Sequence, residues 1–151
     1  TQGVATDVDP EGTQLLSQLY LIVNNVDAVA PGTYVFDRDR GCLDLLQDGD
    51  FRREAGVLGL GQEIPRDASV NVYFMTDLKP LLQRFGNRGY RLAQMEASVS
   101  AGRLYLAAYA QGFGASGLTF FDDDVTMFFS PHAAGKSVMF LIALGRRLKT
   151  K

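Results

Sequence analysis

Runs of apolar residues divide the chain into segments of strand length. Their β-branched and aromatic content, and the turn residues between them, are typical of β-strands. The runs that predict strands are Leu15–Val23, Thr33–Phe36, Cys42–Leu46, Val70–Met75 and Val138–Leu144. Pro31 and Gly32 precede the second run and a polar DRDRG bend follows it, which predicts a hairpin. The last run is apolar at every position and therefore predicts a central strand covered on both faces.

The longest predicted helix begins near Asn87 and continues to a glycine-rich turn. Its second half, LYLAAYA, is apolar on every side, so we expect this helix to be buried in the centre of the domain. Small residues four positions apart, Ala97 with Ala101 and Ser98 with Gly102, would let another backbone approach closely. The expected neighbour is a second helix, either in the same chain or in a partner subunit.

Shorter helices complete the pattern. They are predicted from Asp50 to about Leu60, from Leu78 to Arg84, and from an acidic start at Asp122–Asp124. The order is strand, hairpin, helix, strand, long helix, short strand, short helix, strand, which is an α+β layer arrangement rather than a regular alternation. Residues 1–14 are polar and turn-rich, so we expect a flexible lead-in, followed by one domain over residues 15–151.

Charge and cysteine content exclude several classes of protein. The 151 residues carry a net charge of -2 and lack the clustered basic face expected of a nucleic-acid-binding protein. Cys42 is the only cysteine, so no disulfide can form within the chain. No apolar run approaches the ~20 residues that cross a bilayer. We therefore expect a cytoplasmic protein without a nucleic-acid partner and without a membrane segment.

Several features imitate ligand sites. Gly112–Gly117 matches G-x-G-x-x-G, but a helix precedes it and an extended segment follows, the reverse of a dinucleotide-binding turn. Gly135-Lys136-Ser137 resembles the end of a P-loop, but the earlier glycine and the following helix are missing. His132 is the only histidine and has no second ligand at metal-binding spacing, so no metal site is predicted. Asp122–Asp124 could hold a cation, but capping of the following helix is the favoured interpretation.

Short motifs occur in one order along nearly the whole chain. They are YLIV at Tyr20–Val23 with Pro31–Tyr34, LDLLQDG at Leu43–Gly49, FGNRGYR at Phe85–Arg91, Glu96 with LYLAA at Leu104–Ala108, Gly112–Gly114, and Phe121–Asp123 with the last strand to Gly145. In this order they resemble the nitroreductase-like flavoprotein superfamily, most closely the SagB-type dehydrogenases that form thiazoles and oxazoles. The resemblance implies a three-layer α/β/α sandwich with the long helix at its centre. The family's Arg/Ser helix that holds the FMN phosphate would precede these motifs, so the domain is expected to lack that segment.

The family's chemistry is carried by FMN bound at a homodimer interface. The resemblance therefore implies an FMN-dependent oxidoreductase that moves hydride through flavin N5 between a nicotinamide, NAD(P)H, and a small organic substrate. By position, the backbone donors near N5 would be those of Gly117, Leu118, Thr119 and Phe120. Arg146 and Arg147 follow the last strand and are candidates for the phosphate, because a guanidinium fork binds phosphate oxygens bidentately. The motifs point to no particular catalytic side chain.

A second hypothesis is a degenerate, cofactor-free member of the same superfamily. Such a scaffold would serve as a dimerisation or interaction module. The missing phosphate-binding helix and the small-residue faces of the long helix favour it. Both hypotheses predict a homodimer, because a helix that is apolar on every side needs more cover than one short chain supplies.

Overall fold

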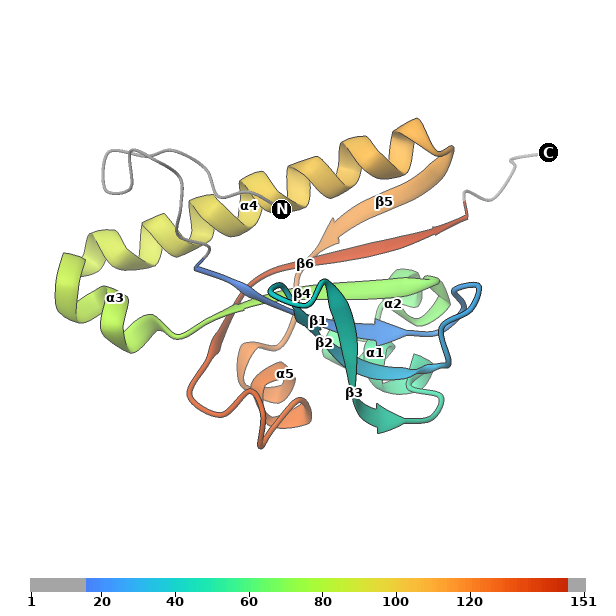
Figure 1. Ribbon diagram of the computed structural model, residues 1–151, viewed down its shortest axis with the longest axis horizontal. Coiled ribbons are helices and arrows are strands. Elements are labelled where there is room, and N and C mark those ends of the chain that lie inside the picture. The colour runs from blue at the N-terminus through green and yellow to red at the C-terminus, as the bar shows by residue number, and fades with distance from the viewer. Residues whose placement is uncertain (1–15, 147–151) are drawn as a thin grey trace.

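A computed structural model describes residues 16–146 of the chain (Figure 1). The strands are β1 (Gln18–Val23), β2 (Gly32–Asp37), β3 (Cys42–Asp48), β4 (Val70–Thr76), β5 (Phe113–Leu118) and β6 (Ser137–Arg146). The helices are α1 (Arg52–Leu58), α2 (Glu63–Asp67), α3 (Leu78–Phe85), α4 (Asn87–Ala110) and α5 (Asp122–Phe128). The predicted lead-in, residues 1–14, lies outside the described residues.

The strands form one sheet in the order β3-β2-β1-β4-β6-β5, and every neighbouring pair is antiparallel. Helices α3 and α4 cover one face, and α1, α2 and α5 lie on the other (Figure 1). Strand β4 shows how the sequence builds both cores: Val72 and Phe74 face α4, whereas Tyr73 and Met75 face α5. This three-layer α/β/α arrangement confirms the predicted fold class.

Helix α4 contacts the sheet through a strip of small residues. Ala93, Ala97 and Ala101 are each at most 1% exposed, and their short side chains let the helix lie close to the strands. The opposite side of α4 is open: Leu106 is 71% exposed and Tyr109 is 62% exposed. The expectation of a helix buried on every side is therefore wrong for the chain by itself, because only one face of α4 meets the sheet.

The glycine-rich segment is a strand, which corrects the expectation of a turn there. The change of direction is confined to Gln111 and Gly112, where Gly112 has a φ of 74° and follows the C-cap of α4. From Phe113 onwards the chain pairs with β6 as an edge strand. Pairing with β6 outweighs the low strand propensity of glycine. The five-residue helix α2 was also absent from the predicted pattern.

Among the helices of the described chain, none combines the length and the apolar character needed to span a bilayer. The cytoplasmic location stays a prediction. Within residues 16–146, no group of three or more His, Cys, Asp or Glu side chains is arranged to hold a metal ion. Asp122–Asp124 lie in the first turn of α5, where they meet the positive end of its dipole, but the N-cap is Phe121 and no side chain caps the helix.

Candidate functional site

The end of β5 is held from the side by helix α4. The backbone N–H of Gly117 donates a hydrogen bond to the hydroxyl oxygen of Tyr105. A Cβ added at Gly117 would lie 2.9 Å from Cζ of Phe140 and 3.3 Å from the Tyr105 oxygen, so only glycine fits here without displacement. The predicted flavin-edge donor of Gly117 is thus already used within the chain.

The two residues after β5 differ from Gly117. Within the described residues, no hydrogen-bond acceptor is found for the backbone N–H of Thr119 or Phe120. The next residue, Phe121, donates its N–H to the carbonyl oxygen of Leu58 at 3.0 Å, which ties the segment to α1. The structure therefore leaves two adjacent backbone donors available between fixed points on α4 and α1.

The other predicted residues occupy both ends of β5. Leu118 pairs with Leu141, and its side chain packs against the core on the α5 side, as does that of Phe120. Arg146 ends β6 opposite Phe113 and is exposed. Phe113 precedes Leu118 by five residues, which corresponds to about 17 Å of extended strand. The structure thus places Arg146 and the N–H groups of Thr119 and Phe120 near opposite ends of β5. Arg147 lies outside the described residues.

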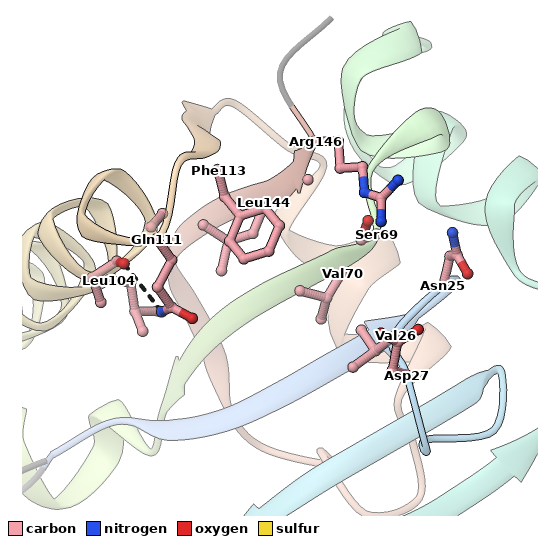
Figure 2. Close-up of a pocket in the computed structure, with 13 residues that line it drawn as sticks. Asn25, Val26, Asp27, Ser69, Val70, Leu104, Gln111, Phe113, Leu144 and Arg146 are labelled. Carbon is pink, nitrogen blue, oxygen red and sulfur yellow. Dashed lines mark hydrogen bonds between the residues drawn. The ribbon is translucent and has the colours of Figure 1, made fainter.

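A cavity of about 400 Å³ borders Arg146 (Figure 2). Its walls come from the C-terminal part of α4, the start of β4, the end of β6 and the loop after β1. Apolar side chains such as Val70, Leu104 and Leu144 form most of the lining, and Asn25 and Asp27 add an amide and a carboxylate. Apolar walls with a few polar groups are typical of small-molecule sites. No motif pointed to Asn25, because it lies in a loop that only the fold brings near the end of β6.

A buried carboxylate joins three elements at the other end of the sheet. Glu96 of α4 is 4% exposed and accepts hydrogen bonds from Ser17 Oγ at 2.7 Å, Ser17 N at 3.2 Å and Ser100 Oγ at 3.0 Å. The guanidinium of Arg38 donates to the Ser17 carbonyl oxygen. Burial lowers the pKa of Arg38, and the nearby charge of Glu96 partly offsets that effect. This cluster anchors α4 to the start of β1.

Comparison with known proteins bears on these observations. No protein-family model matches the chain. A candidate nitroreductase of Methanocaldococcus jannaschii, MJ1384, is 24% identical over 109 residues, which are 72% of this chain and 55% of that protein. The crystal structure of a candidate nitroreductase from Anabaena variabilis superposes with a TM-score of 0.81 at 34% identity, over 87% of this chain and 27% of that one. The chain has a nitroreductase-like fold.

Two further solved structures share this fold at lower identity. A candidate nitroreductase from Ralstonia eutropha has a TM-score of 0.72 at 16% identity, over 99% of this chain and 69% of that one. The E. coli microcin synthetase McbBCD complex, solved with truncated pro-MccB17 bound, has a TM-score of 0.71 at 16% identity, over 87% of this chain and 52% of that one. The chain spans 55% of MJ1384 and 27% of the Anabaena chain, less than two thirds of either.

Proposed function

We propose that the chain is an FMN-dependent oxidoreductase domain that moves hydride through flavin N5 between NAD(P)H and a small organic substrate. The observation that carries this proposal is the 34% identity to the Anabaena candidate nitroreductase over 87% of the chain. Membership of the SagB-type branch is part of the proposal and is supported by the order of the short motifs. When bound, FMN would supply the hydride chemistry, and the protein would bind and orient it.

The residues present fit FMN at both ends of the β5 edge. Thr119 and Phe120 offer free backbone N–H groups, which suit the N5/O4 edge of an oxidised flavin because that edge accepts hydrogen bonds. Arg146 offers an exposed guanidinium for the phosphate, beside a cavity with the Asn25 amide on its wall. Arg147 belongs to the same phosphate hypothesis.

Flavin binding by the full chain tests this proposal. Purified protein is titrated with FMN and, separately, with riboflavin, which lacks the phosphate, and quenching of flavin fluorescence is followed. We expect FMN to bind more tightly than riboflavin, and excess NADH to bleach the bound flavin without oxygen. A chain that takes up neither flavin refutes the proposal.

A matched pair of variants tests the phosphate contact. Arg146→Ala should weaken FMN binding about 10- to 100-fold, which corresponds to the loss of a charge-assisted hydrogen bond, and should leave riboflavin binding unchanged. Arg53→Ala removes an exposed arginine of α1 that does not line the cavity beside Arg146, and should change neither. Equal losses of FMN and riboflavin affinity in Arg146→Ala would show that the arginine does not contact the phosphate.

We also infer a homodimer formed through the outer face of α4. Met95, Val99, Leu106 and Tyr109 are each at least 36% exposed and are spaced four, seven and three residues apart. This spacing, with Gly102 in the gap, is the a/d pattern by which two helices pack. A Cβ at Gly102 would meet nothing within 4 Å, so nothing inside the chain requires glycine there. Close approach of a second helix explains both features.

The same face supports the second candidate function. A cofactor-free scaffold would need the α4 face for assembly but not the free donors at Thr119 and Phe120. The engaged N–H of Gly117 is compatible with that hypothesis. Self-association together with failure to bind any flavin would favour the scaffold over the oxidoreductase.

A further inference from the structure

The segment from Gly117 to Phe121 is held by the pairing of Leu118 with Leu141 and by a hydrogen-bonded fixed point at each end. One fixed point is the hydrogen bond from Gly117 N–H to the Tyr105 hydroxyl, and the other is the bond from Phe121 N–H to the Leu58 carbonyl. Strand β5 is an edge strand, so β6 supports it from one side only. Beyond Leu118 this pairing ends. Tyr105 therefore supports β5 from the side opposite β6 at Gly117, one residue before the pairing with β6 ends.

The Tyr105 contact is built into the packing of α4 on β5. Tyr105 is half-buried and belongs to the partly buried residues that pack against the α4 core. Gly117 lies against both the Tyr105 oxygen and the Phe140 ring, and its lack of a side chain brings its N–H to the hydroxyl. The hydroxyl oxygen acts here as an acceptor for a main-chain donor, a role that phenylalanine at this position could not take.

We propose that Tyr105 is a positioning residue that orients the backbone donors of Thr119 and Phe120 toward the flavin N5 edge. This inference rests on the proposed function. Backbone donors contribute more to binding and catalysis when their direction is held before the ligand arrives, because no free energy is then spent on reorienting them. Tyr105 and the pairing of Leu118 with β6 together hold one end of this segment, so loss of the Tyr105 contact would let the N–H groups of Thr119 and Phe120 change direction without unfolding the sheet.

The Tyr105→Phe variant isolates the hydroxyl while keeping the ring. In flavin-free protein, the Gly117 amide should exchange its hydrogen about tenfold faster than in the original chain, because its acceptor is gone. Tyr90→Phe is the matched control: it lies near the other end of α4, is 46% exposed, accepts a hydrogen bond from the Gln94 side chain, and should leave Gly117 exchange unchanged. Unchanged exchange at Gly117 in Tyr105→Phe would overturn the inference at its first step.

The decisive readout is the difference between oxidised and reduced FMN. Oxidised N5 accepts a hydrogen bond, whereas reduced N5 carries a hydrogen, so misdirected donors weaken binding of the oxidised form selectively. We expect oxidised FMN to bind about fivefold more weakly to Tyr105→Phe and reduced FMN to bind as before, which raises the two-electron potential of bound FMN by about 20 mV. Equal weakening of both forms would show a merely structural role and overturn the inference.

The failure of this inference is distinguishable from failure of the proposed function. If the original chain binds no flavin, the proposed function fails, and the inference fails with it. If the original chain binds FMN and Tyr105→Phe matches it in both affinity and potential, only the positioning role is overturned. Circular dichroism melts of both tyrosine variants establish that the compared proteins are folded.

Discussion

Replacing Leu106 by alanine should weaken self-association of the chain without unfolding it. The Leu106 side chain is 71% exposed on α4, so most of its surface remains to be covered by a partner. Full burial of a leucine contributes about 1.5–3 kcal/mol, and burial of this exposed share therefore contributes about 1–2 kcal/mol per protomer. A symmetric interface contains the residue twice, so the loss is about 2–4 kcal/mol per dimer, or about 30- to 1000-fold in Kd.

Sedimentation velocity over a range of concentrations measures this change directly. Leu82→Ala is the matched control, because Leu82 is 41% exposed on the neighbouring helix α3 and lies outside the α4 stripe. Its Kd should stay within about twofold of the original, which is below 0.5 kcal/mol. A chain that is monomeric at micromolar concentration, or a Leu106→Ala variant that associates as tightly as the original, would refute the proposed interface.

Three further predictions concern stability. Glu96→Gln should lower the free energy of unfolding by about 2–4 kcal/mol in urea denaturation, because a buried carboxylate with three hydrogen bonds loses its charge. An unchanged urea midpoint would contradict this. Burial raises the pKa of Tyr20 to about 12, so the folded chain holds the proton of this hydroxyl more tightly than the unfolded chain does. The resulting contribution to stability is present below pH 10 and is lost as the pH rises towards 12. Tyr20→Phe should therefore show a shallower decline of stability between pH 10 and 12. Gly89→Ala should lower the free energy of unfolding by about 1–3 kcal/mol, because its Cβ would lie 2.6 Å from the Leu81 carbonyl oxygen. Gly102→Ala is the control and should stabilise the monomer by up to about 1 kcal/mol, because its Cβ would meet nothing within 4 Å. Equal effects at the two glycines would argue against the close approach of α3 and α4.

Much of the fold was predictable because local patterns carried it. The strands at Val70–Met75 and Val138–Leu144 and the hairpin after Pro31 appear where their apolar runs and turn residues predicted. The start of the long helix near Asn87 was also correct. These features depend on neighbours within a few residues, so periodicity and turn chemistry suffice to find them.

The candidate site was less predictable, because its chemistry depends on pairing at a distance. Gly117 to Phe120 formed one group in the sequence, yet the fold engages the N–H of Gly117 and leaves those of Thr119 and Phe120 free. That division follows from Tyr105, twelve residues earlier, and from the side-by-side packing of α4 and β5. No local pattern indicates which backbone donor meets a hydroxyl group.

By itself, the sequence determined the order of the strands and of the helices other than α2, and the length of α4. Only the tertiary structure decided that α4 exposes Leu106 and Tyr109, that the glycine-rich segment is an edge strand, and that Glu96 is buried. The physical reason is the range of the interactions. Alternation and capping act between residues close in the chain, whereas the hydrogen bond from Ser17 to Glu96 joins residues 79 positions apart. Burial, and with it the side of α4 left for a partner, depends on contacts of that second kind.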